Sequence, residues 1–454
     1  MGTATNVVDV EALIDRRIGR YQIGIFVLCF LVSLMDGLDS QITSVTGPLM
    51  ARDLGLPPAA LGPLLSASQI GSLVGALALG FCGDRFGRRP TLLACGLLFS
   101  VATLATAMAE TLPVLLVLRA ITGLGIGGAV PCYLALGAEF APRRHRAGIV
   151  ALILGAVPCG GIIAGLIGAG LLGDLGWRNV YLGCGVLSLG VCLLLAWRLP
   201  ESPGFLIASR AAATRIRAVL APLAPPGVVA EATLFRSGEP RQQGVPVTRL
   251  FADGRAPVTL LLWLAFFVTY LVLIGGLVWT PGLMRQSGMS AEGGALALMF
   301  NNVGGILGIV CAGQIIDRFR GAFTPLMVLL FLGGAAATGL VGQAAPNFWG
   351  VILACGATGL FMAAGLSGLY AFATLLYPAE MRSTGLGWAS GFGRVGAAAG
   401  PLLGGTLFAA GQPARVIFLV FGLAAVVNAG AILAIAFCSR RRRPDPADGA
   451  TAPV

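Results

Sequence analysis

The stretch Leu31–Met50 reads LVSLMDGLDSQITSVTGPLM and places Asp36 and Asp39 inside the first long apolar segment of the chain. A carboxylate at the centre of a bilayer costs about 3 kcal/mol on insertion scales, so such residues are rare there and usually functional. Residues three positions apart lie on one face of a helix, about 5–6 Å from each other. The stretch therefore predicts a membrane helix that presents two carboxylates to the same side.

Composition extends this prediction to the whole chain. Of the 454 residues, 57% are hydrophobic and 11% are charged, and the mean hydropathy is +0.88. A soluble protein has about 25% charged residues, and a membrane-spanning helix needs about 20 apolar residues. The apolar runs are continuous and do not alternate as the strands of a β-barrel would. We expect an all-α membrane protein with twelve transmembrane helices, at 21–48, 60–82, 91–109, 113–138, 148–172, 178–198, 258–284, 292–316, 324–343, 347–376, 384–410 and 414–438.

One long polar stretch, 199–257, separates the first six segments from the last six. It holds several prolines and irregular charge, and within it only a short surface helix near Ser209–Leu220 is expected. The predicted domains are a cytoplasmic N-terminus (1–20), two six-helix halves (21–198 and 258–438), a cytoplasmic central loop (199–257) and a cytoplasmic tail (439–454).

Arginine placement predicts the orientation. The chain has no lysine, and its first twenty residues lack the apolar core of a cleaved signal peptide. With both termini inside, 24 of the 30 arginines lie in cytoplasmic segments and four in outer loops. This bias follows the positive-inside rule for an inner-membrane protein. The formal net charge of +11 then comes from arginines that set the membrane orientation, and it does not indicate a nucleic-acid partner.

Ten cysteines are scattered through the apolar segments, and His145 is the one histidine. No cysteine pair has CxxC spacing, so we expect buried small residues and no metal site. No nucleophile–base set or nucleotide motif is found, and the glycines of the fourth segment lack a strand–turn–helix context. The sequence thus predicts neither an enzyme nor a bound cofactor.

The two halves repeat weakly. Asp84-Arg85-Phe86 after the second segment matches Asp317-Arg318-Phe319 after the eighth, and the acidic–basic run 139–143 matches 380–382. Parallel six-helix repeats with a substrate site between them near the midplane are a transporter pattern.

These motifs resemble a known family. Gly83–Arg89 (GDRFGRR) resembles the loop 2–3 signature of the major facilitator superfamily, Arg119–Pro131 resembles its fourth-helix motif, and Pro200–Leu206 (PESPGFL) resembles the motif after its sixth helix. The resemblance covers the whole chain and implies the major facilitator fold.

A narrower resemblance is to the aromatic acid:proton symporters, a branch that imports benzoates, hydroxybenzoates and related carboxylates. It rests on the DGLD run at 36–39, on Trp279–Met284 and on the run from Gly385 to Gly396. The branch often has Asn after the proline of the fourth helix, where this chain has Cys132. The resemblance therefore implies that this chain lacks one polar contact of the branch.

The two aspartates suit proton coupling. Two close carboxylates in a low dielectric resist double ionisation, so they form a proton carrier that titrates as a pair; the alternative is that both are structural. Asp39 and Arg119 lie at similar depths, about 12 Å and 9 Å from the outer ends of their helices. We expect an ion pair between them, which either loosens on protonation or is static. Arg119 also counts among the candidate substrate contacts.

Arg394 lies about 15 Å from the inner surface, with no acid in its own segment. A guanidinium can bind a carboxylate bidentately, so this residue is either the clamp for the substrate carboxylate or a gate that pairs with Asp36. Candidate contacts to an aromatic ring are aromatic and amide side chains of the second half, each of which taken alone is more often a packing residue: Tyr270, Phe300, Asn301, Asn302, Tyr370, Trp388 and Phe392.

Charges in the cytoplasmic loops predict an inner gate of salt bridges, with topogenic surface charge as the alternative. The candidates are Asp84, Arg85, Arg88, Arg89, Glu139, Arg143, Asp317, Arg318, Glu380 and Arg382.

The expected function is import of a small aromatic carboxylate with protons across the lipid bilayer, by alternating access and as a monomer, driven by the proton gradient. The alternatives are a proton-driven exporter of drugs or metabolites on the same fold, and a transporter-like chemoreceptor.

Overall fold

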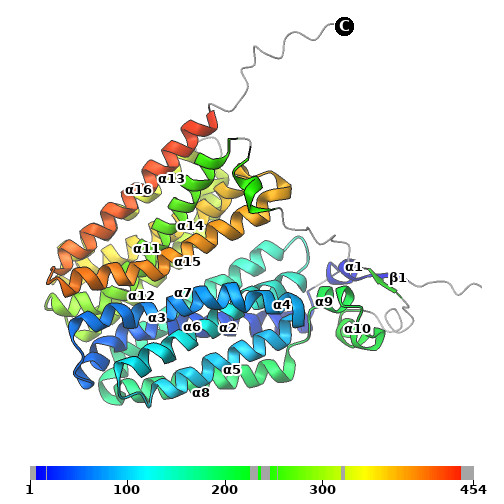
Figure 1. The fold of residues 1–454 in the computed structure, drawn as a ribbon, viewed down its shortest axis with the longest axis horizontal. Coiled ribbons are helices and arrows are strands. Elements are labelled where there is room, and N and C mark those ends of the chain that lie inside the picture. Colours follow the sequence, from blue (N-terminus) through cyan, green and yellow to red (C-terminus); the bar gives the residue numbers. More distant parts are fainter. Residues whose placement is uncertain are drawn as a thin grey trace, which may run out of the picture. The chain divides into compact units, whose positions relative to one another are not determined.

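The computed structural model describes residues 7–16, 18–224, 234–236, 246–252, 254–318 and 323–440. The chain divides into two compact units, Met1–Arg241 and Gln242–Val454, and each contains six long helices in its described part (Figure 1). In the first unit these helices are α2 (Arg20–Asp53), α3 (Leu61–Ala78) continued by α4 (Gly80–Phe86), α5 (Arg88–Thr106), α6 (Leu112–Glu139), α7 (Arg146–Gly170) and α8 (Leu172–Arg198).

The second unit has α11 (Ala256–Gln286), α12 (Ala291–Arg318), α13 (Phe323–Ala344), α14 (Phe348–Leu376), α15 (Ala379–Ala409) and α16 (Ala414–Arg440). Short 3-10 turns precede α3 (Pro58–Ala60) and α11 (Val247–Leu250). The predicted fold of twelve long helices in two sets of six is confirmed. Three boundaries differ by five or six residues, because α2 continues through Pro48 to Asp53, α8 begins at Leu172 and α15 begins at Ala379.

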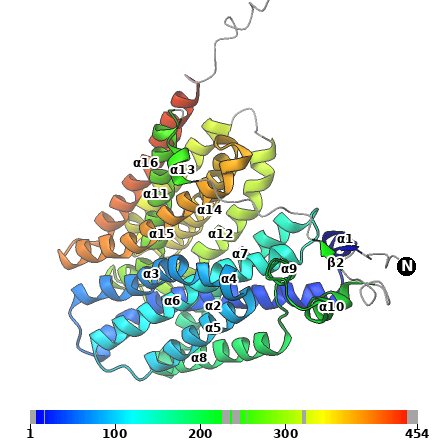
Figure 2. The same cartoon turned by 45° about the vertical axis from the view of Figure 1, so that its right-hand side comes forward.

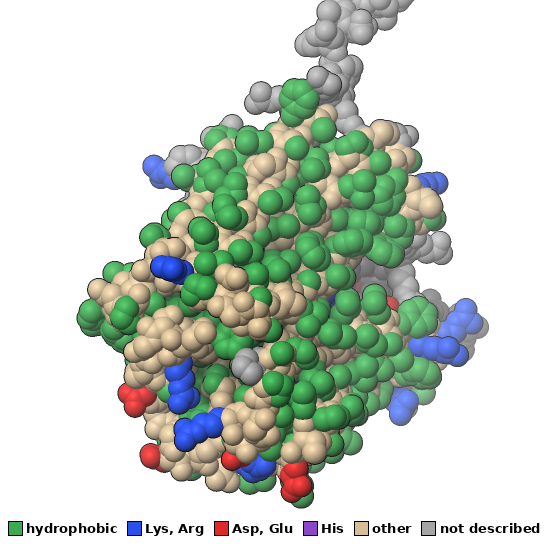
Figure 3. All heavy atoms as spheres, turned by 60° about the vertical axis from the view of Figure 1, so that its left-hand side comes forward, with side chains coloured by type: hydrophobic (Ala, Val, Ile, Leu, Met, Phe, Trp, Pro, Cys, Tyr) green, Lys and Arg blue, Asp and Glu red, His purple; other side chains and the backbone are tan. Residues whose placement is uncertain are grey.

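Eleven of the long helices within the described residues have the length and hydropathy of a membrane span. The remaining one, α15, has 31 residues, which is long enough to cross a bilayer. Its many glycines and the charges of Arg382 and Arg394 lower its hydropathy. On the face shown in Figure 3, hydrophobic side chains predominate and charged ones are few, as expected of helices surrounded by lipid.

Glycines set the closest helix contacts, and they do so in the same way in both units. In the first unit, a Cβ atom at Gly123 of α6 would lie 1.9 Å from the carbonyl oxygen of Ser68 in α3. In the second unit, a Cβ atom at Gly304 of α12 would lie 1.9 Å from the carbonyl oxygen of Gly356 in α14. The second and fourth long helices of each unit therefore pack backbone to backbone, as small residues allow in membranes. The weak sequence repeat is thus a repeat of helix packing.

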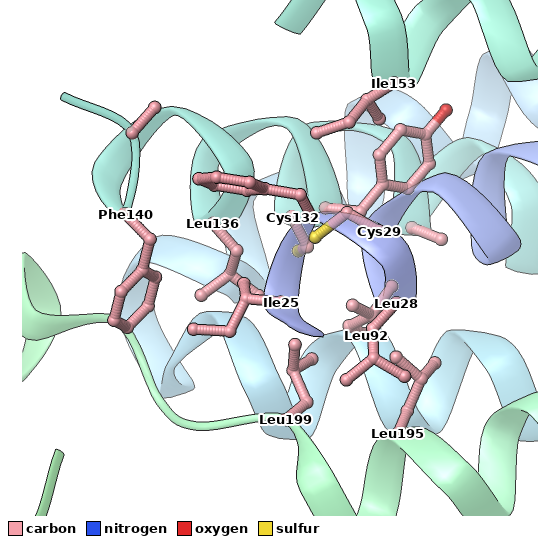
Figure 4. Packing of buried hydrophobic residues seen from close by; sticks show 14 of the residues in the cluster. Ile25, Leu28, Cys29, Leu92, Cys132, Leu136, Phe140, Ile153, Leu195 and Leu199 are labelled. Carbon is pink, nitrogen blue, oxygen red and sulfur yellow. The ribbon is translucent and has the colours of Figure 1, made fainter. Parts of the chain in front are cut away.

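An apolar core occupies the end of the first unit at which α2 begins and α6 ends. It joins buried residues from α2, α5, α6, α7 and α8, whose side chains converge in Figure 4: Ile25, Leu28, Cys29, Leu92, Cys132, Leu136, Phe140, Ile153, Leu195 and Leu199. Cys132 packs against Gly83 of α4, because a Cβ atom at Gly83 would lie 2.8 Å from the Cys132 sulfur. Cys132, at which this chain departs from the symporter pattern, is therefore a packing residue between α4 and α6.

The N-terminus and the central loop form a small assembly that the sequence did not predict. Here α1 (Val10–Ile14), α9 (Pro203–Ala208) and α10 (Ala213–Leu220) lie together in both Figure 1 and Figure 2. The strand β1 (Val7–Asp9) pairs in parallel with β2 (Leu234–Arg236). Buried apolar residues of α1 pack against Leu206, Ile216 and Leu220. The expected short helix near Ser209–Leu220 is α10, and α9 and the strand pair are additional.

Candidate functional site

Asp39 and Arg119 form an ion pair in the interior of the first unit. Nη1 of Arg119 lies 3.1 Å and 3.0 Å from the two carboxylate oxygens of Asp39. Asp39 is 1% exposed and Arg119 is fully buried. The depth argument from the sequence predicted this contact between α2 and α6. A buried pair of this kind is costly to break, because loss of either partner strands the other charge.

Hydroxyl groups complete the shell around the pair. Nη2 of Arg119 donates to Thr106 at 3.0 Å and to Thr122 at 3.1 Å, and Thr103 donates to Asp39 at 3.2 Å. The hydroxyls of Thr106 and Thr122 in turn donate to helix carbonyl oxygens, so each presents only lone pairs to the guanidinium. Within the described residues, Nε of Arg119 has no hydrogen-bond partner. All of these partners belong to the first unit, so the interior of this unit encloses the guanidinium.

Asp36 has a different environment, although it lies one turn away. It is half-buried and accepts a hydrogen bond of 3.2 Å from the hydroxyl of Ser40. Gly37 between the aspartates meets α7 so closely that a Cβ atom there would lie 1.9 Å from the carbonyl oxygen of Val157. The glycine therefore permits the close packing that brings α2 against α7.

In the second unit, Trp388 and Phe392 of α15 stack on Trp263 of α11. The ring centroids are 5.8 Å and 4.4 Å apart, with interplanar angles of 18° and 23°. Phe251 meets the edge of Trp263 at 5.4 Å. Trp263 was not among the residues selected from the sequence. Trp388 and Phe392 therefore pack α15 against α11 through the Trp263 ring. Both side chains nevertheless remain partly exposed.

A second group of candidates meets around Tyr370 of α14. Its hydroxyl lies 3.3 Å from that of Tyr270 in α11, and its ring meets the edge of Phe266 at 5.0 Å. Arg394 of α15 is half-buried and interacts electrostatically with Tyr370. Gly393 makes room for this arrangement, since a Cβ atom there would lie 2.6 Å from the Tyr270 ring. Two phenol groups and a guanidinium from three helices are thus brought together.

The remaining candidates lie on α12. Asn301 and Asn302 are buried, and the amide of Asn302 donates to the carbonyl oxygen of Leu298 at 2.9 Å. Phe300 is 37% exposed. That side chain is therefore more open to a ligand than the two amides.

Charges that the sequence assigned to the inner gate form a connected cluster in the first unit. Arg88 is ion-paired with Glu139, and it lies 4.0 Å from Asp84. One oxygen of Glu201 accepts hydrogen bonds from the backbone N–H groups of Arg88 and Arg89, at 3.0 Å and 3.1 Å. This carboxylate caps the N-terminus of α5, where a negative charge is favourable. Glu201 belongs to the quoted PESPGFL run, but the sequence reading gave it no role.

The same cluster anchors the start of the central loop. Ser202 donates to Glu139 and caps α9 by accepting from the N–H of Phe205 at 2.9 Å. At Gly87 the backbone has a φ of 106°, and a Cβ atom would lie 2.5 Å from Glu201. The spacing of glycine and charge in GDRFGRR therefore suits a tight turn filled by a carboxylate.

The other predicted gate residues lie elsewhere. Arg143 contacts Glu11 and Asp15 of the N-terminal segment, and its backbone N–H donates to Asp15 at 2.6 Å. Arg85 is exposed beside Phe86, and Arg89 donates to the carbonyl oxygen of Ala196 at 2.7 Å.

In the second unit, Arg318 and Arg382 are exposed. The side chains of Asp317 and Glu380 lie outside the described part of the structure. The inner gate as a whole stays a prediction. Among the described residues, no group of three or more potential metal ligands occurs.

Comparison with known proteins identifies the family. The model of the Major Facilitator Superfamily matches residues 29–341 and 324–453. The chain is 37% identical to the gallate transporter of Pseudomonas putida, over 96% of this chain and 97% of that protein. It is 34% identical to the 4-hydroxybenzoate transporter PcaK of Pseudomonas aeruginosa, over 95% of this chain and 96% of that protein.

Among solved structures, an inward open conformation of the xylose transporter XylE from Escherichia coli superposes with a TM-score of 0.69. It is 19% identical and covers 91% of this chain and 95% of that chain, which shows a shared fold. The chain therefore belongs to the Major Facilitator Superfamily. It is a multi-pass membrane protein of a transporter family and not an enzyme.

Proposed function

We propose that this protein imports an aromatic carboxylate of the hydroxybenzoate and benzoate class together with protons, by alternating access. The substrate class is supported by identity of 34–37% to the gallate and 4-hydroxybenzoate transporters over nearly the full length of the chain. The gradient of protons drives the cycle, and no cofactor takes part.

One observation carries the proton coupling, namely the buried pair of Asp39 and Arg119. A pair that is only structural could be replaced by apolar side chains at little cost. A carboxylate that binds and releases the transported proton would give the buried pair a function. In the proposal, a proton binds to a carboxylate oxygen of Asp39 and the attraction to Arg119 weakens. Asp36, half-buried one turn away, is the second carboxylate of the proton path.

For the substrate, we propose that Arg394 binds the carboxylate and that Tyr270 and Tyr370 flank the ring. The support is their grouping on three helices of the second unit, with phenol hydroxyls that can both donate and accept. Trp388, Phe392 and Phe300 supply partly exposed aromatic surface from α15 and α12. This assembly is better suited to an aromatic acid than to a sugar, which would call for more amide and carboxylate groups.

For the cellular setting, we propose a monomer in the inner membrane with both termini in the cytoplasm. The support is the arginine distribution, with 24 of 30 in the segments assigned to the cytoplasmic side.

The test is uptake of labelled gallate, 4-hydroxybenzoate, protocatechuate and benzoate by cells that express the protein, with and without a protonophore. We expect accumulation of at least one of these acids, abolished by the protonophore. Asp36→Asn and Asp39→Asn should each abolish accumulation, whereas Asp174→Asn, at an exposed position of α8, should not. Accumulation that ignores the proton gradient would rule out symport, and no uptake of any of the four acids would rule out the substrate class.

A further inference from the structure

Tyr181 of α8 is a fully buried residue that contacts the ion pair from a third side. The guanidinium carbon of Arg119 lies 4.8 Å from the centroid of the Tyr181 ring. The Tyr181 hydroxyl lies 2.8 Å from the hydroxyl of Thr43, which is one helical turn beyond Asp39 on α2. Tyr181 thus contacts the arginine with its ring face and the aspartate's own helix with its hydroxyl.

Arg119 is held by more than Asp39. Thr106 and Thr122 hold Nη2 through lone pairs, and Thr43 lies 3.5 Å from Nη1. All three are neutral, so Asp39 is the group that balances the arginine's charge. When Asp39 binds a proton, the guanidinium stays in place with its hydroxyl contacts but without a counter-charge.

We propose that Tyr181 is a positioning residue of the coupling pair, whose ring face holds the charge of Arg119 while Asp39 is protonated. This inference rests on the proposed proton coupling and adds a residue to it. A cation over an aromatic face is attracted by the ring quadrupole, and the attraction is strongest at desolvated sites. Because the Tyr181 ring still attracts the guanidinium, Arg119 keeps its position when Asp39 becomes neutral. The state with Asp39 protonated therefore stays accessible.

The ring is fixed so that it can act in this way. Trp177 meets the edge of the Tyr181 ring at 6.2 Å, and its indole N–H donates to Asp53 at the end of α2, at 3.0 Å. The bond to Thr43 holds the opposite end of the ring. Tyr181 therefore keeps its orientation independently of the charge on Asp39.

The Tyr181 ring should favour the protonated state of Asp39 over the ionised state. With Asp39 ionised, the carboxylate balances the guanidinium, and the ring adds little. With Asp39 neutral, the ring contact carries a larger share of the stabilisation. Weakening the ring should therefore make protonation of Asp39 harder, so that a lower pH is needed to load the proton.

Few other titratable groups share this site. Those that interact with Arg119 in the described residues are Asp39 of α2 and Tyr181 and Cys184 of α8. On the α5 side, the neighbours Thr103 and Thr106 do not titrate. Cys184→Ala therefore removes the other group on α8 and serves as a control, with the pH midpoint expected to stay in place.

The experiment replaces residue 181 by phenylalanine and by a series of increasingly fluorinated phenylalanines in the full-length protein. Fluorination weakens the quadrupole and hardly changes the shape of the ring, so packing is preserved. Two quantities are measured: the pH midpoint of proton-driven 4-hydroxybenzoate uptake in liposomes, and the midpoint of the Asp39 carboxyl band in infrared titration, with Asp39→Asn as the blank.

We expect both midpoints to fall progressively with fluorination, and to fall by about one pH unit in Tyr181→Leu, which has no ring. Tyr181→Phe should keep the wild-type midpoint, because the ring remains and only the bond to Thr43 is lost. An Asp39 carboxyl midpoint that is the same across the fluorinated series would refute the role of Tyr181. Uptake that is insensitive to a protonophore would instead refute the proton coupling, so the two failures are distinguishable.

Discussion

Breaking the buried ion pair from one side should cost far more stability than removing it altogether. Asp39 and Arg119 are essentially inaccessible to solvent, and after Asp39→Asn the arginine keeps its contacts to neutral hydroxyls and to the Tyr181 ring but loses its counter-charge. Removing one partner of such a pair typically costs about 3–5 kcal/mol, whereas replacing both by apolar groups of similar volume is often nearly neutral. The same cost is expected for Arg119→Leu, which strands the carboxylate.

A double-mutant cycle measures the coupling directly. The free energy of unfolding is determined for wild type, Asp39→Leu, Arg119→Leu and the double variant, by reversible detergent-induced unfolding followed by tryptophan fluorescence. We expect each single variant to lose about 3–5 kcal/mol and the double variant to lose less than either single variant, so that the coupling energy is at least about 3 kcal/mol. The surface ion pair of Asp53 and Arg178 is half-exposed and serves as the control, with no measurable coupling expected.

The refuting result is additivity. If the losses of the two single variants add up in the double variant, then the contact between Asp39 and Arg119 contributes no coupling energy, and the charges are balanced by other groups. The uptake assay on the same proteins separates stability from function, because the double variant should be stable and yet fail to accumulate substrate.

Three further predictions follow from other contacts. Glu201→Ala should lower the free energy of unfolding by about 1–2 kcal/mol, because the carboxylate caps two N–H groups of α5; an unchanged unfolding midpoint would show that the cap is dispensable. Arg394→Lys should weaken binding of 4-hydroxybenzoate at least about tenfold in equilibrium binding, since an ammonium cannot form the bidentate contact; unchanged affinity would place the carboxylate elsewhere. Gly123→Ala should prevent folding or activity, because its Cβ atom meets a backbone carbonyl, whereas Gly155→Ala, with nothing within 4 Å, should behave as wild type in size-exclusion chromatography and uptake.

Helix number, helix order and the contact between Asp39 and Arg119 could be predicted because they depend on local signals. Runs of about 20 apolar residues mark each span, and a rise of 1.5 Å per residue converts position into depth. Depth alone selected the right partner for Asp39, because few charges occur within the apolar segments. The threonine and tyrosine shell could not be found in this way, since hydroxyl-bearing residues in membrane helices are common and carry no charge signal.

Contacts between segments distant in sequence were missed for a different reason. Arg143 carries a charge suited to the gate, but it binds Glu11 and Asp15, which lie more than 120 positions earlier. The parallel pairing of β1 and β2 joins segments separated by more than 200 residues, each only three residues long. Neither strand has a periodic pattern long enough to be recognised. Trp263 was missed because one aromatic residue in an apolar helix does not show which neighbour it will stack on.

The two aspartates that define the first helix are therefore not equivalent, although they share a helix face. Asp39 lies in a closed shell with a permanent counter-charge, so protonating it means giving up an ion pair that the fold has already optimised. Asp36 is half-buried and accepts a hydrogen bond from Ser40, so its carboxylate is more accessible than the buried carboxylate of Asp39. A proton that reaches the pair in the proposed cycle should thus meet Asp36 first and Asp39 last. The energy of the final transfer is then set by how well the site holds Arg119 once its counter-charge is gone.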